Sequence, residues 1–436
     1  MLAGVCVTLR RIFRPLVKFT ITIALDDSSI HAVRKALAIT RTSAILDSVE
    51  KLNIGQMKMK WGSRWRAQFP IIFSPTLFTL TKAIPAMRHL HTVRLFQTFL
   101  PRTYFYCILS SPHITYLILE SIYPPEITTS PPPLPPTLRK LTIIEVHSWR
   151  TLEPLIALVA TSLEYLEFQC CNFLFHNQCE YQYKPPSFSC LHELRELRHY
   201  QRNCSWFGNA IVLRNLLQLG PQVTQVHIVG TLWNYGALSP PKSLRHLSTD
   251  NAMLRTGILG VDPWSQLMSL TIHSHSLRRG SRHLNLALII RHYFPRITSL
   301  HLHIPWSLRN FALIMARSQE NVQALELFII ITCTMEWGET GGIEVEISAD
   351  YLRTAILPAA LRSIKLDIFD KTDWGIGPCT RWVNDNIIPD ETGLGGPDLR
   401  SIELSFIQPE SGSERERVLR RRRWIKSPND DSQIEG

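Results

Sequence analysis

The chain has 436 residues, of which 45% are hydrophobic and 19% are charged, and these proportions exclude a disordered protein and favour a globular one. It contains no apolar run of about 18 residues or more, so we do not expect a membrane-spanning helix. The formal net charge is +11, which leaves nucleic acid open as a partner.

The first 23 residues combine a helix pattern with a strand pattern. Apolar residues recur at helical spacing between residues 5 and 16. Phe19, Ile21 and Ile23 then alternate with other residues, which is typical of a half-buried strand. We therefore expect a short helix and then a strand before the main body of the chain.

From residue 49 onward one short pattern recurs, in which an apolar residue is followed by two residues, a second apolar residue, one residue and a third apolar residue. Leu138-x-x-Leu141-x-Ile143 is a clear example. Such self-similarity is typical of a leucine-rich-repeat solenoid, whose repeats are roughly 20–29 residues long. The candidate repeats begin at Val49, Leu90, Ile114, Leu138, Leu163, Leu194, Val223, Leu244, Leu267, Ile297, Val322, Leu361 and Leu399.

Strand geometry explains this spacing. Side chains alternate faces in a strand, so the fourth and sixth residues of each repeat face the core. His199 and Thr249 replace the third apolar residue in two repeats. Helix-like apolar stretches lie between strands at residues 155–159, 211–219, 286–293 and 311–316. We therefore predict an α/β leucine-rich-repeat solenoid (horseshoe) with a parallel β-sheet on the concave face and helices on the convex face.

One segment before the repeats carries a resemblance to a known family. The run Val-Cys-x-x-Leu-Arg-x-x-x-x-Pro-Leu at residues 5–16 resembles the last helix of an F-box in fungal F-box proteins with leucine-rich repeats. Residues 38–54 look like that family's first repeat. The earlier, Leu-Pro-rich helix pair of a full F-box does not precede this run, and the alternative is a helix that caps the solenoid. The resemblance implies contact with a Skp1-type adaptor through Val5, Leu9, Phe13, Pro15 and Leu16.

We divide the chain into three parts. Residues 1–25 form the F-box-like helix or an amino-terminal cap, residues 26–408 form a degenerate solenoid of about 10–13 repeats, and residues 409–436 form a basic and then acidic tail that is partly disordered. Seven Lys or Arg residues lie between residues 414 and 426. Such a run is typical of a nuclear-import signal or a nucleic-acid patch, and the alternative is a solvated final helix.

Catalytic and cofactor motifs are absent from the sequence. It contains no Gly-x-x-x-x-Gly-Lys, Gly-x-Ser-x-Gly or His-Glu-x-x-His pattern. The nine cysteines show no disulfide-framework spacing, which favours reduced thiols in a cytoplasmic or nuclear protein. A Cys/His cluster between residues 170 and 192 lacks paired zinc-knuckle spacing. We therefore expect no metal, no cofactor and no enzymatic activity.

Residues that alternate with the inward apolar positions are expected on the concave face, where a protein substrate would bind. Five of them are histidines on four consecutive strands, which would form a stripe because stacked strands lie about 4.8 Å apart. Either this stripe binds a partner in a pH-dependent way, or the histidines fill a half-exposed polar surface. The candidate binding residues are Tyr116, Tyr165, Glu167, Arg198, Tyr200, His227, His246, His273, His301, His303 and Glu326.

These observations predict a non-catalytic protein–protein recognition scaffold. The resemblance narrows this prediction to a substrate-recognition subunit of an SCF-type ubiquitin ligase. Two alternatives stay open: a stand-alone leucine-rich-repeat interaction protein without ligase docking, and a basic solenoid associated with nucleic acid. Basic residues do not dominate the concave positions, so nucleic acid is the less favoured partner, and no membrane partner is expected.

Overall fold

The structure is a computed structural model, and it divides into two compact units, residues 1–223 (unit 1) and 224–436 (unit 2), each of which is treated by itself. Within them the structure describes residues 19–24, 38, 41, 46–55, 82–97, 102–122, 137–146, 149–171, 191–200, 207–229, 240–250, 264–273, 290–305, 320–331, 360–370, 400–409, 416–427 and 430–435.

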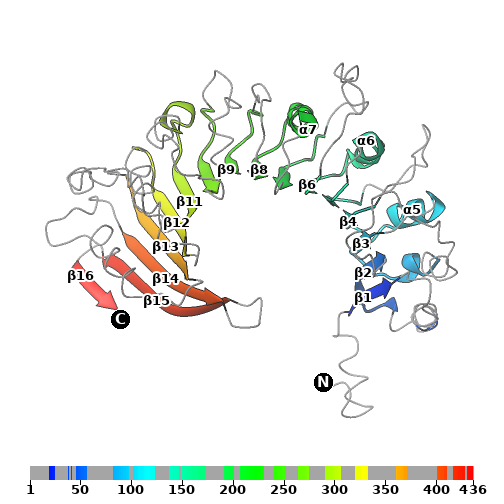
Figure 1. Ribbon diagram of the computed structural model, residues 1–436, viewed down its shortest axis with the longest axis horizontal. Coiled ribbons are helices and arrows are strands. Elements are labelled where there is room, and N and C mark those ends of the chain that lie inside the picture. The colour runs from blue at the N-terminus through cyan, green and yellow to red at the C-terminus, as the bar shows by residue number, and fades with distance from the viewer. Residues whose placement is uncertain are drawn as a thin grey trace, which may run out of the picture. The chain divides into compact units, whose positions relative to one another are not determined.

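The strands of unit 1 pair in parallel, and their order in the sheet follows the order of the chain (Figure 1). The register is constant, because Leu117, Leu141, Leu166 and Leu197 align across four neighbouring strands. The described strands are β1 (Phe19–Ala24), β2 (Val49–Gly55), β3 (Thr92–Phe96), β4 (Tyr116–Glu120), β5 (Lys140–Ile144), β6 (Tyr165–Gln169) and β7 (Glu196–Tyr200).

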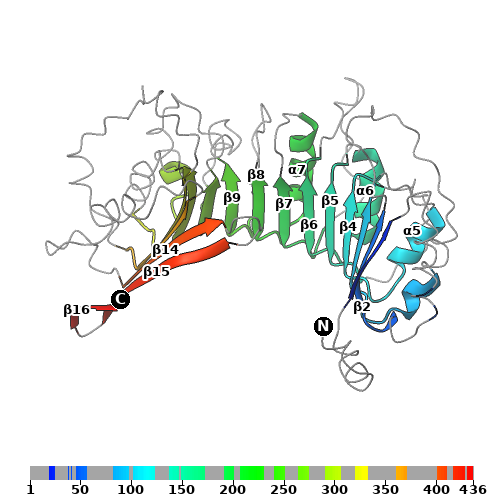
Figure 2. The same ribbon diagram turned by 60° about the horizontal axis from the view of Figure 1, so that its bottom comes forward.

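Helices cover one face of the unit 1 sheet (Figures 1 and 2). They are the 3-10 helix η3 (Ile84–Ala86) and the α-helices α5 (Arg102–Leu109), α6 (Trp149–Val159) and α7 (Phe207–Leu219). Each α-helix buries an apolar stripe, for example Phe105 on α5, Leu155 on α6 and Leu216 on α7. The helices predicted at residues 155–159 and 211–219 are thereby confirmed.

Unit 2 continues the same strand-by-strand pattern and then changes direction. Strands β8 to β14 pair in parallel in chain order, whereas β15 pairs antiparallel with β14, and β16 antiparallel with β15. The described strands are β8 (Gln225–Val229), β9 (His246–Asp250), β10 (Ser269–His273), β11 (Ser299–Pro305), β12 (Ala324–Ile331), β13 (Ser363–Asp370), β14 (Ser401–Pro409), β15 (Glu416–Ser427) and β16 (Asp430–Glu435).

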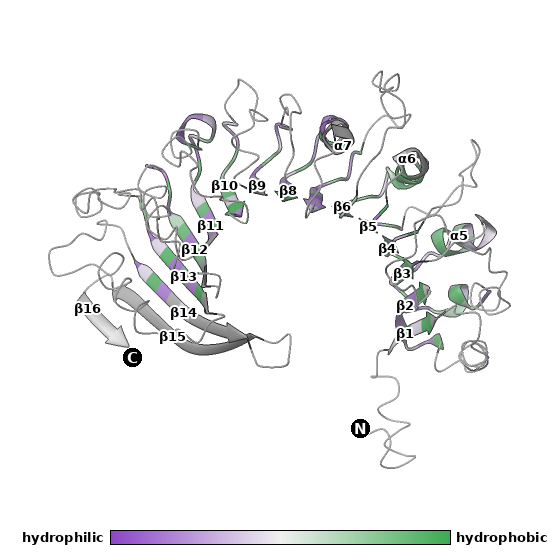
Figure 3. Ribbon diagram, in the orientation of Figure 1, coloured by the Kyte–Doolittle hydropathy of each residue, from purple (hydrophilic) through white to green (hydrophobic). Residues whose placement is uncertain are grey.

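The apolar triplets form the core of both units. Along β4, Leu117 and Leu119 are fully buried while Tyr116, Ile118 and Glu120 are half-buried. Figure 3 shows the corresponding alternation of hydrophobic and hydrophilic residues along β11 to β13. Full burial of one such leucine contributes about 1.5–3 kcal/mol. The fold is therefore an α/β leucine-rich-repeat solenoid, as predicted.

A left-handed residue follows each of four consecutive strands in unit 1. Gln97, Ser121, Glu145 and Cys170 have φ values of 44°, 48°, 55° and 52°. The backbone N–H of each donates to a carbonyl at the end of the next strand, as from Ser121 to Ile144 at 2.7 Å. This repeated bond compensates the conformational cost of positive φ and turns the chain out of the sheet.

The structure differs from the sequence-based expectation at the carboxyl-terminal end and adds one strand before the predicted repeats. Residues 416–435, expected as a tail, add β15 and β16 to the sheet of unit 2. The alternation at residues 19–23 gives β1, a parallel strand before the thirteen repeats. The predicted helices at residues 5–16 and 311–316 lie outside the described residues, as do Leu399 and most of the helix at residues 286–293.

Candidate functional site

The side of each sheet opposite the buried triplets carries all of the predicted partner-binding residues. We call it the open face, and it consists of the first, third and fifth residues of each five-residue strand segment. In unit 1 the register aligns these positions in rows, so that Thr142, Glu167 and Arg198 are neighbours on β5, β6 and β7. The open face is thus a continuous array of side chains within each unit.

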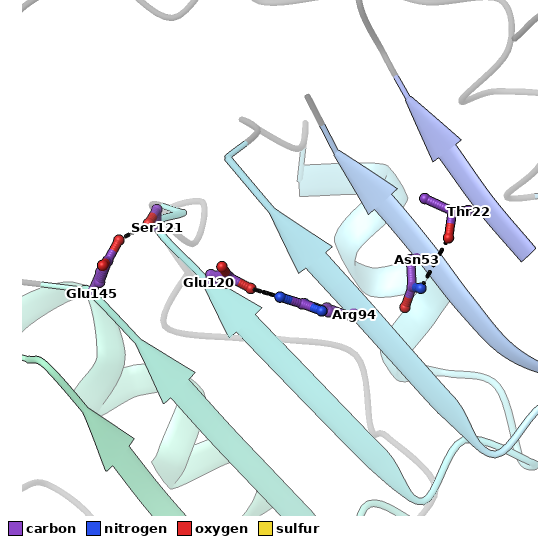
Figure 4. Close-up of polar contacts among 6 residues, drawn as sticks. All are labelled: Thr22, Asn53, Arg94, Glu120, Ser121 and Glu145. Carbon is purple, nitrogen blue, oxygen red and sulfur yellow. Dashed lines mark hydrogen bonds and ion pairs between the residues drawn. The ribbon is translucent and has the colours of Figure 1, made fainter. Parts of the chain in front are cut away.

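At its amino-terminal end, the open face of unit 1 is held by polar contacts between neighbouring strands (Figure 4). The Asn53 amide donates to the Thr22 hydroxyl at 3.1 Å, and Arg94 forms an ion pair with Glu120. Just beyond the strands, the Ser121 hydroxyl donates to Glu145 at 2.6 Å. These contacts are part-buried or exposed, so each contributes at most about 1 kcal/mol and mainly fixes side-chain positions.

The centre of the unit 1 open face is a carboxylate covered by its neighbours. Glu167 is only 6% exposed, so the expectation of an accessible carboxylate at this position is wrong. Its Oε2 accepts hydrogen bonds from the Tyr165 hydroxyl at 2.5 Å and the Thr142 hydroxyl at 3.1 Å, and its Oε1 accepts one from the Gln169 amide at 2.6 Å. These donors replace the water that burial removes.

Two cations and a second tyrosine surround the same centre. Arg198 lies 5.3 Å and Lys140 lies 6.0 Å from the centroid of the Tyr165 ring, within the range of cation–π attraction. Arg198 also pairs with Glu196 at 2.5 Å. The Tyr116 hydroxyl hydrogen-bonds Thr142 at 3.0 Å, which extends the network by one strand. We call Tyr116, Thr142, Tyr165, Glu167, Gln169 and Arg198 the tyrosine cluster.

Electrostatics keep the Tyr165 hydroxyl protonated. Burial, together with the hydrogen bond to the Glu167 carboxylate, raises the pKa of Tyr165 well above its ordinary value of 10.0. The hydroxyl therefore stays protonated, and can donate to Glu167, further into the alkaline range than an ordinary tyrosine. Because its partners hold it in one orientation, the Tyr165 ring presents a fixed surface on the open face.

The open face of unit 2 contains stacked rings from three neighbouring strands. The rings of His273 and His303 lie 4.4 Å apart between centroids, and those of His303 and Phe328 lie 5.3 Å apart. Ser248 fixes the first ring through a 2.8 Å hydrogen bond between its hydroxyl and His273 Nε2. The stack thus combines one phenylalanine ring with two imidazole rings.

A row of charged groups runs beside these rings. His301 Nδ1 lies 2.9 Å from Glu326 Oε2, and His301 Nε2 lies 2.7 Å from the Ser299 hydroxyl. On the next strand, Lys365 pairs with Asp367 at 3.0 Å. The hydrogen bond to Asp367 raises the pKa of Lys365, and its attraction to Glu326 and Glu403 adds to this effect. Carboxylates outnumber cations among these side chains, whereas the neighbouring strand β15 places Arg423 and Arg421 opposite Glu403 and Ser405.

The five predicted histidines do not form one stripe, because the register places them in three different rows. His246 opposes Ser269 in the first row, His227 opposes Ser248 in the third-position row, and His273 opposes His303 in the fifth-position row. His301 belongs to the same row as His227. Of these residues, His273 and His303 bring their rings together, with 4.4 Å between centroids.

The remaining predictions have mixed outcomes. Tyr200 lies on the open face at the end of β7, half-buried, and its binding role stays a prediction. The adaptor-contact residues Val5, Leu9, Phe13, Pro15 and Leu16 lie outside the described residues. Thr142 was not among the predicted binding residues. Its position between the inward-facing Leu141 and Ile143 would have placed it on the open face.

Neither a metal centre nor a membrane-crossing helix is found in the described ranges. No group of three or more His, Cys, Asp or Glu side chains among the described residues is arranged to hold a metal ion. Cys171 is fully buried, and burial raises its pKa to about 12, which is typical of a structural thiol. In the same ranges, no helix is both long enough and apolar enough to cross a bilayer.

Comparisons with known proteins find similarity only among solved structures. No protein-family model matches the chain, and no curated protein matches it. A chain of the TLR13–ssRNA13 complex is 13% identical, with a TM-score of 0.33, over 77% of this chain and 42% of that one. A chain of the mouse RP105/MD-1 complex is 12% identical, with a TM-score of 0.32, over 79% and 60%. The chain therefore spans less than two thirds of the length of either structure.

Proposed function

We propose that this chain is a non-catalytic scaffold that binds a protein partner on its open face. The observation that carries the proposal is the tyrosine cluster, in which Tyr165 and Arg198 are oriented around the buried carboxylate of Glu167. Tyrosine and arginine are enriched among the residues that dominate the free energy of protein association. A cluster of both on one sheet face is therefore suited to be the centre of an interface.

Preorganisation strengthens this interpretation. A surface side chain that is already held in one rotamer loses less conformational entropy on binding, and this loss is about 0.5–1.5 kcal/mol per flexible side chain. Tyr165 is held by Glu167, and Tyr116 is held by Thr142. The two tyrosines thus present an apolar surface whose side chains are already ordered in the folded protein, so partner binding costs little further conformational entropy.

The chemistry of the partner differs between the two units. On the open face of unit 2, Glu326, Asp367 and Glu403 lie near Lys365, and the register places Arg423 and Arg421 of β15 opposite Glu403 and Ser405. The carboxylates on β12 to β14 would repel the phosphates of a nucleic acid and attract lysine or arginine of a partner segment. The stacked rings of His303 and Phe328 offer that segment an apolar contact.

The experiment compares partner capture by matched variants. Affinity purification is carried out with the wild-type chain and with the Arg198→Ala and Arg88→Ala variants. We expect it to recover a partner protein that binds at least about tenfold more weakly to Arg198→Ala and with unchanged affinity to Arg88→Ala. Arg88 is a suitable control because it is an exposed arginine in the turn before Leu90, away from the cluster. Recovered partners are then purified and measured by calorimetry after nuclease treatment. Equal binding by all three proteins, or binding that the nuclease abolishes, rejects the proposal.

A narrower role follows if residues 5–16 act as the resemblance implies. We propose that the chain is then a substrate-recognition subunit of an SCF-type ubiquitin ligase, in which Leu9 and Phe13 contact a Skp1-type adaptor and the open face binds the substrate. Support comes from the motif at residues 5–16 and from a solenoid that provides a separate recognition surface. Co-purification with the adaptor, lost on Leu9→Asp, tests this role. If the adaptor co-purifies with neither the wild-type chain nor Leu9→Asp, the ligase role is rejected. The scaffold proposal is unaffected by that result.

A further inference from the structure

A hollow of about 450 Å³ lies at the amino-terminal ends of strands β9 to β13 in unit 2. Its volume is within the range of roughly 300–1,000 Å³ that ligand sites occupy. The hollow is separate from the open face, because its lining comes from the turns and the residues just before the strands. The described residues of the lining are Arg245, Ser265, Gln266, Met268, Arg296, Thr298, Asn321, Gln323 and Ala360.

The charge of this lining is positive. Arg245 and Arg296 contribute two guanidinium groups, and no carboxylate is among the described residues that line the hollow. Arg296 forms no ion pair with any described residue, whereas Glu320 beside the hollow is already paired with Arg291. Arg245 is held by carbonyl oxygens, since its Nη1 donates to those of Lys242 and Leu244, each at 3.1 Å. Carbonyls orient a guanidinium without neutralising it.

The rest of the lining matches a peptide better than a small inorganic anion. Gln266, Asn321 and Gln323 carry side-chain amides, which can both donate to and accept from a peptide backbone. Met268 is 48% exposed and is the exposed large hydrophobic side chain of the described residues. An exposed, flexible methionine in a binding surface adapts to apolar side chains of different shape.

We propose that this hollow binds an acidic peptide segment, in which a carboxylate pairs with Arg245 and Arg296 and a neighbouring apolar side chain contacts Met268. The main chain at this edge cannot add a strand, because its N–H groups already donate across the ladder, as from Thr298 to Met268 at 2.8 Å. The side chains of the hollow therefore recognise the peptide, and the glutamates or aspartates of the peptide determine the specificity of binding. This site is independent of the scaffold role proposed for the open face.

The test uses the full chain and a fluorescein-labelled peptide of alternating glutamate and leucine, with a glutamine–leucine peptide of equal length as the uncharged probe. Fluorescence anisotropy should give a Kd of about 100 μM or tighter for the acidic probe and at least tenfold weaker binding for the uncharged one. Arg296→Gln should weaken the acidic probe about tenfold, and Met268→Ser several-fold. Arg291→Gln removes the same charge nearby and should change the Kd less than about twofold.

Four outcomes overturn the proposal: no binding of the acidic probe at about 1 mM, equal binding of both probes, an equal loss from Arg291→Gln, or displacement by inorganic phosphate at an affinity equal to that of the peptide. Arg296 is exposed, so its substitution is expected to leave the fold intact, and circular dichroism of each variant confirms this. Arg198→Ala should not change binding of the probe, which separates this site from the open face.

Discussion

The Tyr165 hydroxyl donates a 2.5 Å hydrogen bond to Glu167 Oε2 from two residues away on the same strand, and this bond joins a half-buried ring of the tyrosine cluster to its most deeply buried charge. Side chains at positions i and i+2 of a strand share a face, so the sequence spacing alone allows the contact. The bond has consequences for stability as well as for binding.

Removal of the carboxylate should destabilise the fold. Glu167→Ala leaves the donors of Thr142, Tyr165 and Gln169 without their acceptor, and a buried donor that loses its partner costs about 1–3 kcal/mol. We expect a decrease of that order in the free energy of unfolding, measured by urea denaturation. Glu193→Ala, in an exposed turn, is the control and should change it by less than about 0.5 kcal/mol. Equal values for the two variants contradict the burial of Glu167.

The inward leucines should be more costly to truncate than any residue at the edges. Leu166 and Leu300 are fully buried in unit 1 and unit 2, so Leu166→Ala and Leu300→Ala should each cost about 2–5 kcal/mol. Met268→Ala removes a side chain of similar size that is 48% exposed, and its effect should be less than about 1 kcal/mol. Thermal unfolding of the three variants measures the difference, and a comparable loss in all three is inconsistent with the assignment of faces.

The sequence predicts the strands of this fold more fully than it predicts the site. Each of the thirteen candidate repeats forms a strand within the described ranges, because the spacing of Leu163, Leu166 and Phe168 reports directly which side chains face inward. Burial of an outward residue depends instead on neighbouring repeats. Glu167 is covered by Tyr165 and Thr142, and no local pattern around residue 167 signals this.

The histidines show a different reason for a missed prediction. Their strands were predicted correctly, but His246, His227 and His273 occupy the third, fifth and seventh positions of their repeats, counted from Leu244, Val223 and Leu267. Positions two apart lie on the same face but in different rows, since each row corresponds to one register position. The sequence therefore contained the signal that separates the rows, and the stacked pair of His273 and His303 follows from it.

The two described cysteines in unit 1 that differ most in burial should react at different rates. Cys171 is fully buried with its pKa raised to about 12, and its Sγ lies 3.4 Å from the carbonyl of Ile143. Cys107 is exposed. Iodoacetamide reacts with the thiolate, so at pH 8 peptide mass mapping should find Cys107 modified first and Cys171 modified only after denaturation. Modification of both at equal rates in the native protein contradicts a structural role for Cys171.

His199 should make the fold sensitive to acid. Its side chain is 1% exposed at the third apolar position of its repeat, and neither ring nitrogen has a hydrogen-bond partner among the described residues. Burial lowers its pKa from 6.5 to about 4. Between these values the unfolded chain binds a proton that the folded chain does not, so the contribution of His199 to stability is complete above about pH 6.5 and is lost as the pH falls toward 4.

The size of this effect follows from the two pKa values, and a substitution can isolate it. The difference between 6.5 and about 4 corresponds to about 3 kcal/mol of stability lost across that window. His199→Leu places an apolar side chain in an apolar position, so its unfolding free energy should fall less between pH 7 and pH 4 than that of the wild type. His192→Gln alters an exposed histidine and should keep the wild-type slope. Urea denaturation at a series of pH values measures all three slopes, and an unchanged slope for His199→Leu means that the ring is not buried as a neutral group.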